Sequence, residues 1–141
     1  MRTKRTNFSK KQCIEIKTKN DVPPVMKAKK LLCRYRMDGC GHCIDSQKDW
    51  DNVCKKVEGK LNPNCMLAEV EEKMLPFFRM PDGFKPQGFP THSIFENGKH
   101  VENVEDRTFQ GLMKSLRKHN FIKNKNRVTT GKRRRRSFRQ Q

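Results

Sequence analysis

The stretch RYRMDGCGHCIDSQKDW, residues 34–50, decides the fold of this chain. An apolar run around Leu31 precedes it, and a helical pattern continues to about Val57. Two cysteines separated by two residues, where a strand passes into a helix, are typical of a dithiol redox site. This spacing lets both sulfurs meet at the first helical turn, where unpaired N–H groups and the helix dipole favour a thiolate. We therefore expect Cys40 to be the exposed nucleophile and Cys43 the resolving thiol.

The same stretch resembles the active-site segment of thioredoxin-fold proteins. Cys-Gly-His-Cys with Trp50 seven residues after the second cysteine is the variant found in protein disulfide isomerases. A second match lies downstream, where 88–91 (GFPT) and then 94–95 and 97–99 resemble the family's cis-proline loop, strand and hairpin. The resemblance covers roughly 12–119. It implies an α/β thioredoxin-like fold, with a central mixed sheet of four to five strands and helices on both faces.

The resemblance also implies roles for individual residues. In the family, a histidine at the position of His42 stabilises the reduced thiolate, which biases the pair toward oxidase or isomerase chemistry; we place Gly41 with it as redox-tuning. Phe89, Pro90 and Thr91 would shape a substrate groove, with Pro90 in the cis form against both sulfurs. No metal or organic cofactor is expected, since a redox-active disulfide carries two electrons. A zinc site is the alternative, but the chain has no second Cys-x-x-Cys.

Two positions depart from the family's pattern. Six residues before Cys40 the family usually has a buried acid that accepts a proton from the second cysteine, and here the residue is Arg34. A cation favours a thiolate but cannot act as that base, so we count Arg34 as redox-tuning. Gly39 replaces a common tryptophan. With these two departures, the chain could be an enzyme with slow turnover, or it could retain the fold for another function.

Periodicity and turn signals give the order β-α-β-α-β-α-β-β-α. Strands are expected at 13–17, 30–36, 65–71, 91–95 and 99–104, the last two joined by a hairpin at Asn97-Gly98. Helices are expected at 22–28, from the Cys-x-x-Cys to 57, at 73–80 with a break at Pro76, and from an N-cap at Asp106 to 118–119. Cys33 and Cys65 are expected to be core thiols on adjacent strands.

Basic residues outnumber acidic ones by 33 to 15, and the excess lies at the ends of the chain. Residues 1–11 carry five basic side chains and 120–141 carry nine, with no acidic residue in either segment, which gives 14 of the 18 net positive charges. We therefore divide the chain into a basic tail at 1–11, a thioredoxin-like domain at 12–119 and a basic tail at 120–141.

The run Lys132, Arg133, Arg134, Arg135 and Arg136 is expected to contact a polyanion, such as nucleic acid bound without base readout, or the acidic surface of a large assembly. It could equally be a nuclear localisation signal. We see no signal peptide and no membrane span in the sequence. We therefore expect a non-secretory protein, located in the cytoplasm or nucleus of a host cell or packaged in a virion.

Two functions from different classes remain. The first is a thiol-disulfide oxidoreductase that acts on protein thiols. The second is a non-catalytic structural protein of a capsid or virion, built on a thioredoxin fold and anchored by its basic tails. Small basic chains of this kind resemble thioredoxin-like proteins of large DNA viruses.

Overall fold

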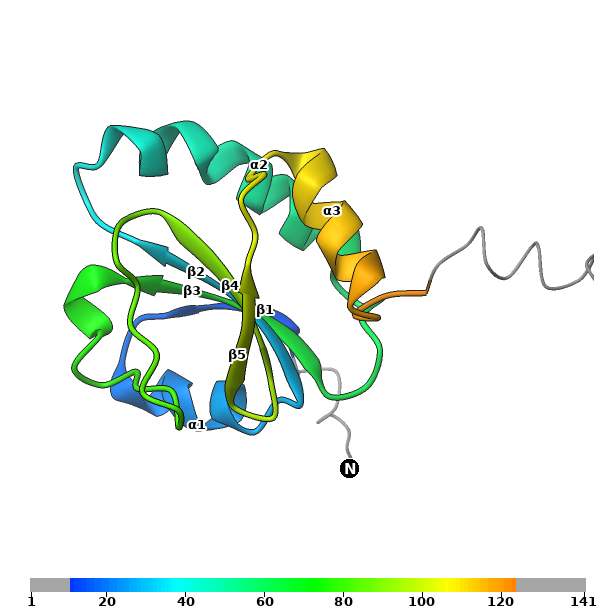
Figure 1. Ribbon diagram of the computed structural model, residues 1–141, viewed down its shortest axis with the longest axis horizontal. Helices are drawn as coiled ribbons and strands as arrows, with labels where there is room; N and C mark the ends of the chain where they lie inside the picture. The colour runs from blue at the N-terminus through cyan, green and yellow to red at the C-terminus, as the bar shows by residue number, and fades with distance from the viewer. Residues whose placement is uncertain (1–10, 124–141) are drawn as a thin grey trace, which may run out of the picture.

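The computed structural model describes residues 11–123, which form one five-stranded mixed sheet with helices on both faces (Figure 1). The strand order is β1-β3-β2-β4-β5. The strands are β1 (Cys13–Ile16), β2 (Lys30–Arg36), β3 (Cys65–Glu71), β4 (Thr91–Glu96) and β5 (Lys99–Asn103). The helices are α1 (Val22–Met26), α2 (Gly41–Val57) and α3 (Phe109–Lys118), with short 3-10 turns η2 (Lys19–Asp21) and η3 (Glu72–Met74).

Strand β2 lies at the centre of the sheet, parallel to β3 and antiparallel to β4. All of its interior residues, from Leu31 to Tyr35, are buried, as expected of a strand covered on both faces. Side chains alternate between the two faces of a strand. Leu31 and Tyr35 therefore belong to one core cluster, while Leu32 belongs to the other. Arg34, one residue before Tyr35, shares its face of the sheet with Leu32.

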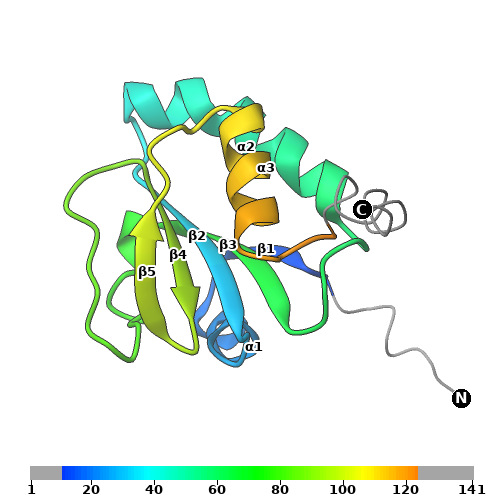
Figure 2. The ribbon, with the colours of Figure 1, turned by 45° about the vertical axis from the view of Figure 1, so that its right-hand side comes forward.

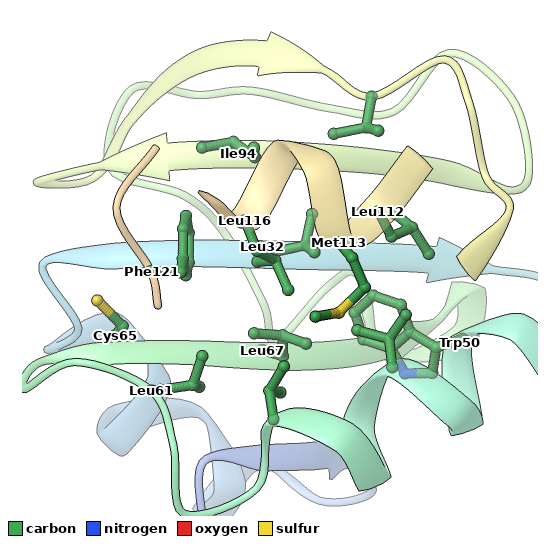
Figure 3. Packing of buried hydrophobic residues seen from close by; sticks show 13 residues of the cluster. Leu32, Trp50, Leu61, Cys65, Leu67, Ile94, Leu112, Met113, Leu116 and Phe121 are labelled. Atoms are coloured by element: carbon green, nitrogen blue, oxygen red, sulfur yellow. The ribbon is translucent and has the colours of Figure 1, made fainter. Parts of the chain in front are cut away.

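Helices α2 and α3 cover one face of the sheet (Figures 1 and 2). Leu32 belongs to the core cluster on this face. Figure 3 shows the packing of this cluster, in which side chains from both helices meet those of the three central strands. Its residues include Leu32, Leu67 and Ile94 from the strands, Trp50 and Val53 from α2, and Leu112, Met113 and Leu116 from α3. Helix α1 and the segment around Phe78 cover the other face. The two layers hold the carboxyl end of β2 next to the first turn of α2.

The hairpin between β4 and β5 forms as the sequence predicts. Asn97 and Gly98 both have positive φ values. A tight hairpin turn requires this backbone conformation, and Asn and Gly tolerate it better than other residues do. The bounds of β2 also agree with the prediction.

The helix expected at 73–80 was wrong in extent, because only η3 forms there, ahead of the predicted break at Pro76. The N-cap predicted at Asp106 was also wrong. Thr108 has the extended backbone of an N-cap, and its side chain accepts the N–H of Gly111. Asp106 instead accepts hydrogen bonds from the N–H and the hydroxyl of Thr108, so it orients the cap.

The packed body continues past residue 119, into the segment that the sequence analysis assigned to the basic tail. Phe121 is completely buried in the cluster beneath α2 and α3. Its N–H donates to the carbonyl of Leu116 at 2.8 Å, and its carbonyl accepts the N–H of Asn62 at 2.7 Å. The basic composition of 120–141 did not indicate this contribution to the core, because a single aromatic side chain makes it.

Within the described part of the chain, every helix is too short or too polar to cross a membrane.

Candidate active site

Cys40 is the N-cap of α2, with an extended backbone (φ −85°, ψ 119°) that places its sulfur over the first turn. The sulfur accepts the N–H of Cys43 at 3.2 Å. It also lies 3.6 Å from the carbonyl oxygen of Phe89, to which the thiol donates. The side chain is partly exposed, so a sulfur of another molecule has a path to it.

Cys43 lies one turn further along α2 and is almost fully buried, at 3% exposure. Its sulfur accepts the N–H of Met37 at 3.5 Å. A small pocket of about 180 Å³ beside this thiol is lined by Met37, Ile44 and Gln47 among others. The two cysteines are free thiols in this structure.

The two thiols differ in acidity. A hydrogen bond from the Cys43 side chain is the main cause that lowers the pKa of Cys40, and the backbone N–H groups of His42 and Cys43 and the charge of Arg34 act in the same direction. Burial is the main cause that raises the pKa of Cys43, followed by its hydrogen bond with Cys40. Cys40 is thus the thiol that ionises first.

The loop before β4 reaches the dithiol, where the carbonyl oxygen of Phe89 lies next to the Cys40 sulfur. The Phe89–Pro90 peptide bond is cis, which confirms that prediction. Pro90 is buried and Phe89 is half-buried. Thr91 pairs with Tyr35 of β2, and its hydroxyl donates to the carbonyl of Gly88 at 2.7 Å. Pairing of β4 with β2 therefore brings this loop to the end of the sheet from which the Cys-x-x-Cys emerges.

Gly41 and His42 form the exposed start of α2 between the two sulfurs. The imidazole of His42 has no hydrogen bond to any residue in 11–123 that the structure describes. Its backbone N–H is the part of the residue that acts on Cys40.

Arg34 is completely buried directly behind Cys43. Its guanidinium donates to the carbonyl of Cys43 at 2.7 Å, to the hydroxyl of Ser46 at 2.9 Å and to the amide oxygen of Gln47 at 3.1 Å. It also forms a salt bridge with Glu69, its direct neighbour across the β2–β3 ladder. Arg34 and its partners thus form a charged network at the position where thioredoxin-fold proteins usually have a buried acid.

Glu69 is a site residue that the sequence analysis missed. It is 7% exposed and also pairs with Arg36, whose Nε lies 3.2 Å from its carboxylate. One signal was available, since a carboxylate in the middle of the apolar run of β3 needs a buried partner. Which partner it finds depends on strand register, which a sequence alone does not reveal.

His92 is the second missed residue. It lies on β4, on the other side of Arg34 in the sheet, and its ring packs 5.7 Å from that of Trp50. Burial, together with the positive charges of Arg34 and Arg107, lowers the pKa of His92 to about 3. Neither ring nitrogen has a partner among the described residues. The histidine is therefore neutral and leaves Arg34 as the buried cation.

Among residues 11–123, no three His, Cys, Asp or Glu side chains gather in a group that could hold a metal ion. The remaining predicted site residues, 132–136, lie outside the described residues, so their contact with a polyanion stays a prediction.

Comparisons with known proteins agree with this geometry. Among solved structures, the first thioredoxin domain of mouse protein disulfide-isomerase A4 superposes with a TM-score of 0.61 at 18% identity, covering 75% of this chain and 74% of that one. The expected fold class is thereby confirmed: the chain has a thioredoxin-like fold, with a mixed five-stranded sheet and helices.

Similarity in sequence extends to curated proteins. The chain is 30% identical over 93 residues to a protein disulfide-isomerase of Zea mays, and 24% identical over 92 residues to bloodstream-specific protein 2 of Trypanosoma brucei brucei. These matches cover 62% and 65% of this chain but only 17% of each relative. No family model matches. The chain is therefore similar in sequence to one part of each of these longer relatives. The resemblance to viral proteins stays a prediction.

Proposed function

We propose that this chain is a thiol-disulfide oxidoreductase that acts on protein thiols through Cys40 and Cys43, with an oxidase or isomerase bias. The observation that carries the proposal is the contrast between the two sulfurs. Cys40 is accessible and has a lowered pKa, whereas Cys43 is buried beside it with a raised pKa. An accessible thiolate next to a protonated resolving thiol is the arrangement that disulfide exchange needs.

Reduction of a substrate begins when the Cys40 thiolate attacks one sulfur of a substrate disulfide. The Cys40–substrate bond forms, the substrate S–S bond breaks, and the second substrate sulfur leaves as a thiolate that takes up a proton. Cys43 then loses its proton and attacks the Cys40 sulfur. The Cys40–Cys43 disulfide forms and the reduced substrate leaves with both electrons. Run in reverse, the same steps oxidise a substrate dithiol.

Arg34 favours the oxidising direction. Its charge lowers the pKa of Cys40 and opposes the increase in the pKa of Cys43, so it stabilises the reduced pair. A stabilised reduced form makes the disulfide a stronger oxidant. The pairing with Glu69 moderates this effect by neutralising part of the charge.

Phe89, Pro90 and Thr91 would guide the substrate. The carbonyl of Phe89 lies next to the reacting sulfur, where an extended substrate segment could pair with backbone atoms. Binding of this kind reads the backbone rather than particular side chains, which suits an enzyme that acts on several proteins.

The test is insulin reduction and the refolding of a scrambled disulfide substrate, with wild type compared with Cys40→Ser and Cys43→Ser. We expect Cys40→Ser to abolish both activities, and Cys43→Ser to accumulate a mixed disulfide with the substrate. Cys54→Ser is the matched control, since it removes one thiol at the far end of α2 and should retain activity. Equal rates for wild type and Cys40→Ser would reject the enzyme and favour the structural alternative.

A further inference from the structure

A second pair of cysteines lies at the opposite end of α2 from the candidate active site. Cys13 begins β1, and Cys54 is in the last turn of α2. The Cys13 sulfur lies 3.9 Å from the carbonyl oxygen of Cys54. Both side chains are partly buried and pack against the same core cluster. The start of β1 and the end of α2 lie on the same side of the molecule (Figure 2).

Hydrogen bonds fix the strand and the helix in this position. Glu58, just past α2, accepts the N–H of Gln12 at 3.0 Å and the N–H of Cys13 at 3.3 Å. The side-chain oxygen of Gln12 in turn accepts the N–H of Gly59 at 2.7 Å. Because these bonds join residues 12–13 to residues 58–59, the side chains of Cys13 and Cys54 are held near each other without a covalent bond.

We propose that Cys13 and Cys54 form a second redox-active dithiol, which closes into a disulfide that joins β1 to the end of α2. This site is separate from Cys40 and Cys43 and does not depend on the proposed function. Cys13 and Cys54 are free thiols in this structure, so closure is a change of state that an oxidant would bring about.

The chemistry requires a disulfide as oxidant, such as a low-molecular-weight glutathione-type disulfide. A hydrogen bond with Cys54, burial and the charge of Glu58 raise the pKa of Cys13, which keeps it protonated. Attack therefore starts from the Cys54 sulfur, which gives its proton to solvent, forms a mixed disulfide with one sulfur of the oxidant and releases the other as a thiolate. Cys13 then gives its proton to solvent and attacks the Cys54 sulfur, releasing the second thiolate. Two electrons pass to the oxidant.

A Cys13–Cys54 disulfide would link the edge strand β1 covalently to α2. Strand β1 pairs only with β3 within the described chain, and a short edge strand has few ladder bonds. A covalent link between residues far apart in the chain restricts the unfolded ensemble. The oxidised form should therefore unfold at a higher urea concentration than the reduced form.

The test uses the full chain carrying Cys40→Ser and Cys43→Ser, so that the first dithiol cannot contribute. The chain is equilibrated with oxidised and reduced glutathione, free thiols are blocked, and peptides are analysed by mass spectrometry. We expect an intramolecular Cys13–Cys54 bond that forms at a glutathione disulfide level at least about tenfold lower in the folded chain than in concentrated urea, since proximity favours closure.

The matched control moves the helix thiol without changing the number of cysteines. Cys54→Ser combined with Asn52→Cys puts a thiol on an exposed face of α2, and it should yield separate glutathione adducts and no increase in the urea midpoint. Cys13→Ser should also lose both effects. The proposal is overturned if Cys13 and Cys54 carry only separate adducts in the folded chain, or if the bond forms equally well in urea.

Discussion

Glu69→Gln is the substitution that most directly tests the buried network behind Cys43. It removes the carboxylate that, among the described residues, compensates the fully buried guanidinium of Arg34 and also pairs with Arg36. Breaking a buried ion pair from one side costs about 3–5 kcal/mol, because the remaining charge is left uncompensated. Arg34 keeps neutral acceptors at Cys43, Ser46 and Gln47, so we expect the lower end of that range.

Urea denaturation gives the measurement. A loss of about 3 kcal/mol in the free energy of unfolding, at an m-value of about 1.5 kcal/mol/M, moves the midpoint down by about 2 M. Glu15→Gln is the matched control. It makes the same chemical change on β1, where the side chain is exposed and pairs with Arg36. An exposed pair of this kind should cost less than about 1 kcal/mol to break.

A double variant distinguishes the cost of an uncompensated buried charge from the cost of altered side-chain packing. Replacing both partners, with Arg34→Met and Glu69→Leu, removes the charges together, and we expect most of the stability lost in Glu69→Gln to return. The reasoning is refuted if Glu69→Gln moves the midpoint no more than Glu15→Gln does, because Arg34 would then need no buried counterion.

Four further outcomes follow from the same structure. Arg34→Met removes a positive charge that lowers the pKa of Cys40, so the pH midpoint for alkylation of Cys40 should rise, and an unchanged midpoint would exclude this electrostatic role. His92 has a folded-state pKa of about 3, below its unfolded value, so its contribution to stability is complete above the unfolded pKa and is lost as pH falls between the two. Urea unfolding should therefore show a loss of stability on the order of 2 kcal/mol from this residue between neutral and mildly acidic pH, a difference that His92→Gln should remove. Deleting 124–141, which holds eight basic residues, should abolish most heparin retention without loss of thiol exchange. Heparin retention that survives deletion of 124–141 at moderate salt would exclude this segment as the binding site. The longer deletion of 120–141 should in addition lower the urea midpoint, because it removes Phe121 from the core.

The sequence by itself determined the features that depend on near neighbours in the chain. The apolar run of β2 predicted its bounds, Asn97-Gly98 predicted the hairpin turn, and the spacing of Cys40 and Cys43 predicted a helix N-terminus with two sulfurs on its first turn. Each signal lies within one turn or one strand, where periodicity and backbone preference act directly.

The tertiary structure alone decided which distant residues meet. Arg34 contacts Glu69 because the register of β2 and β3 places them side by side. His92 is neutral because its position on β4 buries it next to Arg34. Cys13 lies near Cys54 because the start of an edge strand docks against the end of a helix. Contacts between residues dozens of positions apart depend on strand order, register and burial. Local patterns do not encode these, so the charge balance at the candidate site emerged only from the folded chain.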